Sequence, residues 1–494
     1  MTPGLQRQSF GRLGTIGVAL ALACAYAGAL PLLVAQTGEP AGYTVLDRTM
    51  VGDYPQDVAA LRDMESKVIE VAEKAMPFVI KVGQGSGVII DADGLILSQW
   101  HVTHKDPARG PGDRIRVVFR GGEERSAELL GADIFNDISL LRLIEPGPYP
   151  FISIAERADV QLGDPVIKFG YPVSGGRPSR APVVRLGRVV CAGEDSIRKH
   201  GFFVADCFVN GGDSGGPLFD LDGRLVAIIR ASAMPHIVRP NFGGVRPRHR
   251  SVFSYTTSAR VREVLPKMLE GKVLPDRPPQ RREEYSCLRS TTQVPPDCWT
   301  QGSYTCRAYG NATKKVGQSV VEIRDGDGKA VSLGFVVGDD GWLMTRSATL
   351  PLYPVCVLPD GRELVAEIVG VSSKLNIAML KVQAIGLQAI SWGEPVDLPV
   401  GTLVAIPGSA ANTVAAGVVS VSNPDATFEH DAGLLPHEYG GPIVDLSGRV
   451  VGVSISPLVY GSIALSVEEV RASVPELKSG RLRPKIGIPK GLAP

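Results

Sequence analysis

A glycine-rich turn around one serine is the part of the sequence best suited to chemistry. The turn reads Gly-Gly-Asp-Ser-Gly-Gly-Pro-Leu over residues 211–218 and leads into an apolar segment, residues 218–229. A serine hydroxyl attacks a carbonyl when a base takes its proton and donors stabilise the resulting oxyanion. The small residues beside Ser214 let backbone N–H groups point at one oxygen. The turn therefore predicts a nucleophile, Ser214, with an oxyanion hole built from Gly212, Asp213 and Ser214.

A base and an orienting acid precede this serine. Residues 85–102 read as a hairpin of two apolar strands around an Asp-Ala-Asp-Gly turn, and His101 lies at the end of the second strand. Asp137 stands directly before another apolar strand, residues 138–141. Taken singly, a histidine at a strand end or an aspartate in a turn is usually structural. Together, in the order His101, Asp137 and Ser214, they predict a triad in which the carboxylate fixes the imidazole tautomer.

These segments resemble the trypsin-fold serine proteases of the bacterial HtrA (Deg) type. The resemblance is carried by the hairpin that leads to His101, the Asp-Ile-Ser-Leu-Leu segment that begins at Asp137, and the Ser214 turn. A strand and helix over residues 253–270 close the family's domain in the same way, so the similarity covers roughly residues 75–273. It implies an all-β domain of two barrels that cleaves peptide bonds through an acyl-enzyme intermediate, without a cofactor.

Substrate contacts are expected beside the serine turn. The strand at residues 225–231 is expected to pair with the backbone of a polypeptide substrate. Phe208, Val209 and Arg230 are the candidate walls of a pocket that would favour small or aliphatic side chains.

The chain departs from the family in two ways. HtrA-type enzymes usually carry asparagine before the nucleophile, whereas this chain carries Asp213, as digestive trypsin-like enzymes do. In those enzymes the carboxylate pairs with an amino terminus freed by zymogen cleavage. No such activation sequence precedes the hairpin here, so Arg198 and Lys199 are the candidate partners. The family's PDZ domains have no room before Pro494, so its peptide-sensing and cage-forming roles are not expected.

The second half of the chain repeats the three segments without their chemical residues. Ala348 stands where the histidine is expected, Asn376 where the aspartate is, and Tyr439 where the serine is. Alanine is no base, asparagine cannot stabilise an imidazolium, and a phenol is a poor nucleophile there. We expect either a structural partner domain or a peptide-binding or regulatory pseudoprotease. A metal site at the His-Asp and His-Glu pairs of residues 430–431 and 437–438 is a third reading, but no standard ligand motif has this spacing.

Composition limits the class of partner. The 494 residues suffice for several domains, and 57 glycines and 38 prolines with 6% aromatic residues suit a turn-rich β architecture. The formal net charge of +1 argues against nucleic acid as an electrostatic partner. No metal or cofactor is expected, and the oligomeric state is not predicted.

The N-terminal segment predicts export. Arg7 and Arg12 precede an uncharged apolar run, residues 13–35, that offers small-residue cleavage sites. The run could span a bilayer if it is not cleaved, so a signal peptide and a membrane anchor both stay open. In either case the catalytic part is expected in the periplasm or outside the cell.

The cysteines agree with an exported protein. Leaving out Cys24, six remain, and an even number in an exported chain suggests disulfides. Cys191 and Cys207 lie on successive apolar strands and are the expected pair, which would brace the strand that delivers Ser214. Two buried free thiols are the alternative.

The segments combine into one layout and one function. The function expected is an exported serine endopeptidase; the alternatives are a non-catalytic peptide-binding or chaperone-like scaffold and, less favoured, a secreted esterase. The layout is a signal peptide or anchor (1–35), a flexible lead (36–56), a trypsin-like protease domain (57–273) that begins with an amphipathic helix (57–75), a Pro-rich and Cys-containing connector (274–312), a degenerate trypsin-like domain (313–480) and a C-terminal tail (481–494).

Overall fold

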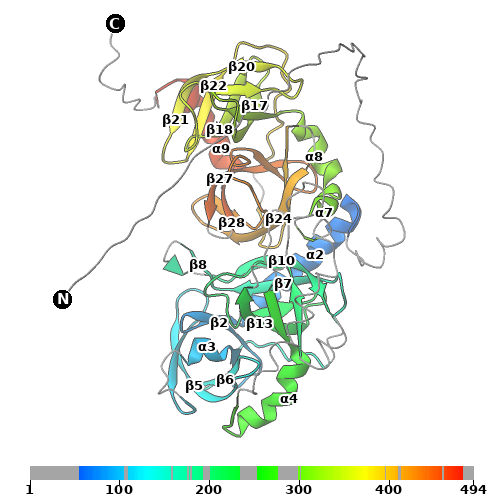
Figure 1. The fold of residues 1–494 in the computed structure, drawn as a ribbon. Coiled ribbons are helices and arrows are strands. Elements are labelled where there is room, and N and C mark those ends of the chain that lie inside the picture. Colours follow the sequence, from blue (N-terminus) through cyan, green and yellow to red (C-terminus); the bar gives the residue numbers. More distant parts are fainter. Residues whose placement is uncertain are drawn as a thin grey trace, which may run out of the picture. The chain divides into compact units, whose positions relative to one another are not determined.

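Short β-strands make up most of the regular structure of the chain (Figure 1). The computed structural model describes residues 55–104, 110–156, 160–174, 177–178, 181–192, 201–233, 253–275, 299–300, 302–394, 397–409, 413–458 and 461–481. The strands are rich in valine, isoleucine and leucine, which suit a pleated and buried surface, and glycine-containing turns separate them.

The first half begins with a long helix, continues as a run of strands with one short helix among them, and ends with a closing helix and a short strand. Its elements are α2 (Val58–Ala75), β1 (Val79–Val82), β2 (Gly85–Ile89), β3 (Leu95–Ser98), α3 (Trp100–Thr103), β4 (Arg114–Val118), β5 (Glu124–Asp133), β6 (Ile138–Leu143), β7 (Pro165–Gly170), β8 (Val173–Ser174), β9 (Arg177–Pro178), β10 (Val183–Cys191), β11 (Phe202–Ala205), β12 (Pro217–Phe219), β13 (Leu225–Ala233), β14 (Phe253–Thr257), α4 (Ser258–Leu269) and β15 (Val273–Leu274).

The second half also runs from helix through a series of strands to a closing helix. Its elements are α7 (Ser303–Arg307), α8 (Gly310–Gly317), β16 (Val320–Arg324), β17 (Ala330–Gly338), β18 (Trp342–Arg346), β19 (Val355–Val357), β20 (Glu363–Val365), β21 (Glu367–Ser372), β22 (Ile377–Lys381), β23 (Leu403–Pro407), β24 (Thr413–Ser422), β25 (Thr427–His430), β26 (Pro442–Val444), β27 (Val450–Leu458), β28 (Gly461–Ser466) and α9 (Val467–Lys478).

Each half is built from two curved sheets. In the first half, one sheet has the order β15-β5-β4-β1-β2-β3-β6 and curls round because β5 also pairs with β6; the other is a closed barrel, β10-β11-β14-β13-β12-β7. In the second half the corresponding sheet is β20-β19-β16-β17-β18-β22-β21, and the closed barrel is β23-β24-β25-β28-β27-β26. The prediction of two tandem double-barrel domains with an all-β fold is therefore confirmed.

The closing helices show how closely the halves repeat each other. α4 and α9 are both 12 residues long and both contain a proline, Pro266 and Pro475, at their ninth position. Each begins at a hydroxyl cap, because Thr257 accepts from the N–H of Arg260 and Ser466 from the N–H of Glu469.

Helix α2 connects the two halves. It begins after Asp57, whose side chain accepts the N–H of Ala60 at 2.9 Å, and its apolar face is buried as predicted. Glu65 on this helix accepts the N–H of Leu403, the first residue of β23, at 2.8 Å. β10 and β24 also lie against each other, and Asp431 accepts the N–H of Leu186 at 3.3 Å. Both halves belong to one compact unit, Val45–Pro494.

The predicted disulfide between Cys191 and Cys207 is wrong, because both are buried cysteines that form no disulfide. In the pairing of β10 with β11, Cys191 lies opposite Val204. Cys207 instead lies against Gly187, because a Cβ added to Gly187 would come 2.4 Å from the Cys207 Cβ. Four residues of strand, about 13 Å, separate Gly187 from Cys191, beyond the reach of a disulfide. Cys24, Cys287 and Cys298 lie outside the described residues.

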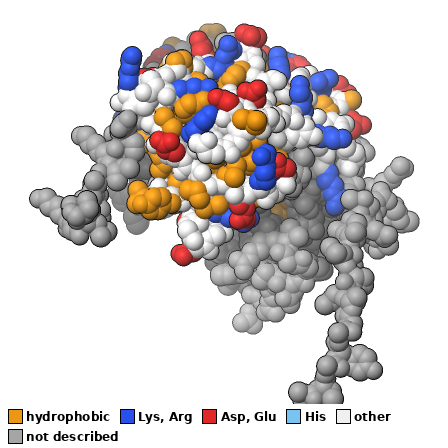
Figure 2. Space-filling model, turned by 90° about the horizontal axis from the view of Figure 1, so that it is seen from above, with side chains coloured by type: hydrophobic (Ala, Val, Ile, Leu, Met, Phe, Trp, Pro, Cys, Tyr) orange, Lys and Arg blue, Asp and Glu red, His pale blue; other side chains and the backbone are white. Residues whose placement is uncertain are grey.

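Charges of both signs are interspersed on the face shown in Figure 2, which fits the near-zero net charge. No helix within the described ranges is long and apolar enough to cross a membrane. The expected N-terminal signal or anchor, residues 1–35, and most of the lead and connector fall outside those ranges.

Candidate active site

Three segments bring His101, Asp137 and Ser214 into contact. His101 lies on the short helix α3, Asp137 on the turn between β5 and β6, and Ser214 on the turn before β12. His101 Nδ1 is 2.6 Å from Asp137 Oδ2, and His101 Nε2 is 3.2 Å from Ser214 Oγ. The imidazole side chain is 47% exposed and the carboxylate 20%, so the site opens to solvent on the side of the histidine. This geometry suits proton transfer from hydroxyl to imidazole.

The backbone at Asp137 fixes its carboxylate on the histidine. Asp137 has φ of +55°, in the left-handed region that aspartate and asparagine tolerate better than most residues. Its second carboxylate oxygen, Oδ1, accepts the backbone N–H of His101 at 2.9 Å, and its carbonyl accepts the N–H of Trp100 at 3.3 Å. The aspartate therefore orients both the ring and the main chain of His101.

The turn before Ser214 presents two backbone donors. The N–H of Val173 binds the Gly211 carbonyl at 2.8 Å, and the N–H of Gly216 binds the Asp213 carbonyl at 2.9 Å. The Gly211 carbonyl shares a peptide group with the Gly212 N–H, and the Asp213 carbonyl shares one with the Ser214 N–H. Because the N–H and the carbonyl of a trans peptide point in opposite directions, these two N–H groups point away from the protein. Within the part of the chain that the structure describes, neither N–H has a protein acceptor. Two such donors can hold an oxyanion.

The predicted contribution of Asp213 to the oxyanion hole is wrong. Its N–H donates to the Asn210 carbonyl at 3.0 Å and is not available to a substrate. Gly212, by contrast, has φ of +96°, and a Cβ there would come 2.4 Å from the Tyr171 carbonyl oxygen, so the turn requires glycine at this position.

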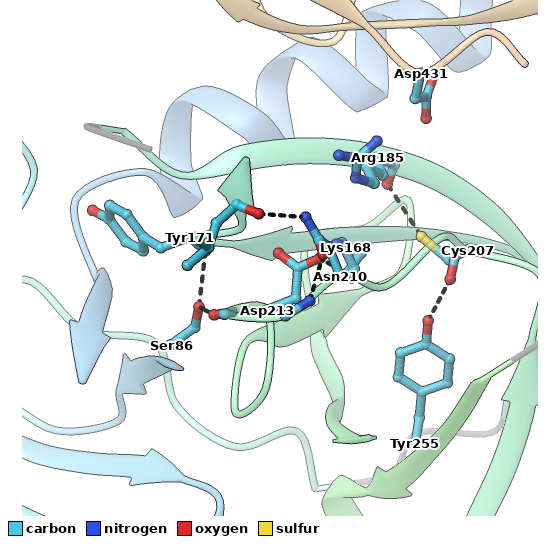
Figure 3. Close-up of polar contacts among 12 residues, drawn as sticks. Ser86, Lys168, Tyr171, Arg185, Cys207, Asn210, Asp213, Tyr255 and Asp431 are labelled. Atoms are coloured by element: carbon cyan, nitrogen blue, oxygen red, sulfur yellow. Dashed lines mark hydrogen bonds and ion pairs between the residues drawn. The ribbon is translucent and has the colours of Figure 1, made fainter. Parts of the chain in front are cut away.

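Ser86 also holds the turn, and sequence analysis missed it. Its hydroxyl donates to the Gly212 carbonyl at 2.7 Å and accepts the N–H of Tyr171 at 2.8 Å, while its own N–H donates to the Ser214 carbonyl at 2.8 Å (Figure 3). Ser86 is fully buried between two glycines of the first hairpin. A polar residue inside an otherwise apolar strand was the available signal.

Asp213 is paired with Lys168 from the middle of β7 (Figure 3). Both side chains have no exposed surface. The expected partners, Arg198 and Lys199, lie outside the described residues, and Lys168 takes the place that was assigned to them. The signal for Lys168 was present, because it is the one charged residue in the strand Pro-Val-Ile-Lys-Phe-Gly.

The predicted pocket residues lie in different surroundings. Val209 is buried, and the half-buried Phe208 packs edge-on against Phe253. Arg230 donates to the Phe135 carbonyl at 3.0 Å, two residues before Asp137 in the chain. Arg230 is therefore held against this segment, and the pocket itself stays a prediction.

The second half keeps the backbone of the site and changes its side chains. Asn376 has the same φ of +55° as Asp137, and its Oδ1 accepts the N–H of Ala348 at 2.9 Å, as Asp137 does for His101. Tyr439 is buried, and its hydroxyl is 2.9 Å from Ser462 Oγ.

The remaining sequence-based candidate in this half, a metal site, finds no support. In the described part of the chain, no three histidine, cysteine, aspartate or glutamate side chains gather as metal ligands would. His430 is instead buried, with Nε2 at 3.3 Å from Ser454 Oγ, and Asp431 binds two backbone N–H groups, of Leu186 and Val418.

Comparison with known proteins places both halves in one family. Residues 85–228 and 333–453 match the trypsin-like peptidase domain. The chain is 33% identical over 153 residues to a probable periplasmic serine endoprotease DegP-like of Rickettsia conorii, covering 31% of this chain and 29% of that protein. It is 33% identical over 165 residues to the periplasmic pH-dependent serine endoprotease DegQ of Escherichia coli, covering 33% of this chain and 34% of that protein.

These matches are partial. The chain matches about a third of the length of either curated relative. A solved serine endoprotease from Yersinia pestis aligns with 24% identity over 42% of this chain and 66% of that chain, with a TM-score of 0.33.

Proposed function

Because the chain belongs to the trypsin-like peptidase family, we propose that it is a serine endopeptidase whose nucleophile is Ser214. The observation that carries the proposal is the continuous contact from Ser214 Oγ through the ring of His101 to Asp137, at 3.2 and 2.6 Å. The curated relatives are named as periplasmic serine endoproteases, which agrees with this chemistry.

In the proposed reaction, His101 Nε2 takes the hydroxyl proton as Ser214 Oγ attacks the scissile carbonyl carbon. Asp137 Oδ2 accepts the Nδ1–H of the ring, which leaves Nε2 free to act as the base and stabilises the imidazolium. The N–H groups of Gly212 and Ser214 bind the oxyanion. His101 then gives the proton to the leaving amine, and water attacks the acyl-enzyme with the same base.

The substrate backbone is proposed to bind along the end of β13. β12 pairs with β13 only as far as Pro217, which faces Ile228, and Ile229 donates to the Gly216 carbonyl at 2.9 Å. Beyond Ile229, residues 230–233 have no strand on that side within the described residues. An extended peptide can add a strand to such an edge. Ala227 and Ile228, which were part of the expected contact, are already paired with β12 on one side and with β14 on the other.

The second half is proposed to lack triad chemistry. Ala348 supplies no base, and Asn376 donates its Nδ2 hydrogen to the Ile455 carbonyl at 2.8 Å, where a triad would need a carboxylate. Tyr439 keeps its hydroxyl on Ser462.

Export is the proposed location, since the curated relatives are named as periplasmic and the sequence begins with a basic and apolar segment. The expected substrates are polypeptides that reach the protein there.

A fluorophosphonate probe tests the proposal, because it reacts only with an activated serine. We expect the full chain to be labelled, and S214A and H101A to lose both labelling and cleavage of an unfolded protein such as casein. No labelling of the folded wild type would reject the enzyme and favour the non-catalytic binder. Hydrolysis of esters with no cleavage of peptides would favour the esterase.

A further inference from the structure

A lysine is buried beneath the nucleophile turn. Lys168 lies in the middle of β7, opposite Arg185 of β10 on one side and Leu218 of β12 on the other. Its side chain has no exposed surface, and its ammonium forms an ion pair with Asp213 Oδ2. An ammonium without a counter-ion at this depth would be very unfavourable, so the pair holds both side chains in place.

Asp213 in turn closes the loop that carries the oxyanion donors. Its Oδ2 accepts the backbone N–H of Asn210 at 2.8 Å, and its own N–H returns to the Asn210 carbonyl at 3.0 Å. Asn210 Oδ1 accepts the N–H of Gly211 at 2.6 Å, and its Nδ2 donates to the Val173 carbonyl at 3.0 Å. The five residues from Asn210 to Ser214 therefore form one hydrogen-bonded unit, with the carboxylate of Asp213 at its base.

The packing leaves this carboxylate little freedom. A Cβ on Gly170 would come 2.4 Å from Asp213 Oδ1, so β7 lies directly against the carboxylate. In the described part of the chain, Lys168 is the one cation in ion-pair contact with it. Arg185 lies near the ammonium, but its guanidinium is over the ring of Phe208 at 5.9 Å. Burial lowers the pKa of Lys168, and the carboxylate of Asp213 acts in the opposite direction.

We propose that Lys168 is a positioning residue for the oxyanion hole: its buried ammonium holds Asp213, and Asp213 holds the Gly212 and Ser214 N–H groups on one point. The cation that organises the turn is thus supplied from within the barrel. The turn needs no free amino terminus and no cleavage of the chain. This inference rests on the proposed function, because it concerns the same reaction.

The test compares K168M, D213N, the double variant K168M/D213N and the conservative variant K168R. Losing one oxyanion donor in serine proteases lowers kcat by roughly 10²–10³-fold. We expect K168M to lower kcat at least 100-fold with KM changed by less than about threefold, because the turn acts on the transition state. A peptide aldehyde adds to the Ser214 hydroxyl and places an oxyanion in the same hole, so its affinity for K168M should fall by a similar factor. The pH profile should keep its lower limb, since the triad is untouched.

The double variant separates positioning from packing. An asparagine at 213 accepts the N–H of Asn210 without needing a cation, so K168M/D213N should recover kcat to within about tenfold of the wild type. D213N alone leaves the ammonium of Lys168 buried and unpaired and should be less active than the double variant. K168R should lie between K168M and the wild type. K381M removes a strand lysine that pairs with Asp340 in the second half, and it should leave kcat unchanged.

Two further measurements correct kcat for unfolded protein and test whether a free amino terminus contributes. Active-site titration with the fluorophosphonate gives kcat per folded molecule, and an N-terminal tag should leave kcat unchanged if the cation is internal. If K168M does not fold, the comparison of D213N with the double variant decides. The inference is overturned if folded K168M keeps kcat within threefold of the wild type, or if D213N equals or exceeds the double variant. A folded wild type that neither reacts nor hydrolyses would overturn the proposed function, and the inference with it.

Discussion

At the scale of single residues, the two oxygens of Asp137 have different tasks. Oδ1 accepts the backbone N–H of His101 and Oδ2 faces the ring nitrogen Nδ1. The second half shows what an amide does in the same place, because Asn376 keeps the backbone bond through Oδ1 and uses its Nδ2 as a donor. An amide at 137 would therefore present a donor to the ring and favour the tautomer with hydrogen on Nε2.

We predict that D137N lowers kcat by about 10⁴-fold, because Nε2 can then no longer accept the proton of Ser214. The melting temperature should change little, since Oδ1 still accepts the N–H of His101. Steady-state hydrolysis measures the loss, and D93N, in an exposed turn of the first hairpin, is the matched control. Activity above a tenth of the wild-type value would contradict the proposed role of Asp137.

Two adjacent buried residues give stability opposite responses to pH. Burial raises the pKa of Asp431 from 3.8 to about 6, although Arg185 opposes this, and burial lowers the pKa of His430 from 6.5 to about 3. Because the pKa of Asp431 is higher in the folded chain than in the unfolded chain, the folded chain binds the proton first as pH falls. Between pH 6 and pH 4 this increases the free energy of unfolding by up to about 3 kcal/mol. The neutral histidine has the opposite effect, because the unfolded chain takes up a proton below pH 6.5 and the folded chain does not.

We therefore predict that the stability of D431N falls more steeply than that of the wild type between pH 7 and pH 4. The stability of H430Q should fall less steeply over the same range. Urea unfolding at four pH values measures both slopes, and constant offsets from lost hydrogen bonds do not affect them. Parallel curves for the three proteins would show that neither group titrates as its burial implies.

At the scale of elements, the same turn geometry recurs in both halves. Gly440 has φ of +94°, and a Cβ there would come 2.4 Å from the Leu333 carbonyl oxygen. Gly215 in the first half has φ of +86°, and a Cβ there would come 2.3 Å from the Ser86 carbonyl oxygen. The turn is therefore retained where tyrosine stands in place of Ser214, which indicates that it is required for the packing of this turn against β17.

We predict that G440A lowers the free energy of unfolding by about 2–4 kcal/mol, because the left-handed backbone and the close carbonyl both oppose a side chain. G326A is the matched control, since a Cβ at Gly326 meets nothing within 4 Å. Its effect should stay within about 0.5 kcal/mol. Chemical denaturation measures both, and equal effects would contradict the argument.

Local patterns predicted the elements and the contact of three side chains, but not what supports them. The hairpin before His101, the helix of residues 58–75 and the repeat in the second half follow from periodicity and turn residues, which are local signals. Lys168 and Ser86 were missed because their partners lie far away along the chain: Asp213 is 45 positions from Lys168, and Gly212 is 126 positions from Ser86. The disulfide prediction failed for the same reason, since a register opposite Val204, not closeness along the chain, sets the position of Cys191.

At the scale of the whole molecule, α2 belongs in sequence to the first half but also binds the second. Glu65 accepts the N–H of Leu403, and Gly401 lies so close to the helix that a Cβ there would come 3.1 Å from the Ile69 Cα. The two halves are therefore expected to depend on each other for stability.

We predict that E65A lowers the free energy of unfolding by about 1–3 kcal/mol, because it leaves the N–H of Leu403 without an acceptor. E65Q should have little effect, since its amide oxygen can replace the carboxylate. E73A, on the exposed face of the same helix, is the matched control. Calorimetry and urea unfolding measure the change, and a loss in E73A as large as in E65A would rule out a specific contact.

The side chains of His101, Asp137 and Ser214 come from segments far apart in the chain, and His101 and Ser214 are separated by 113 positions. Under the proposed function, a ribosome-bound or translocating chain would not hydrolyse peptides, because Ser214 and His101 are not yet in contact. Cleavage would begin only once the native topology is complete. Measured hydrolysis would then report only the molecules whose fold is complete.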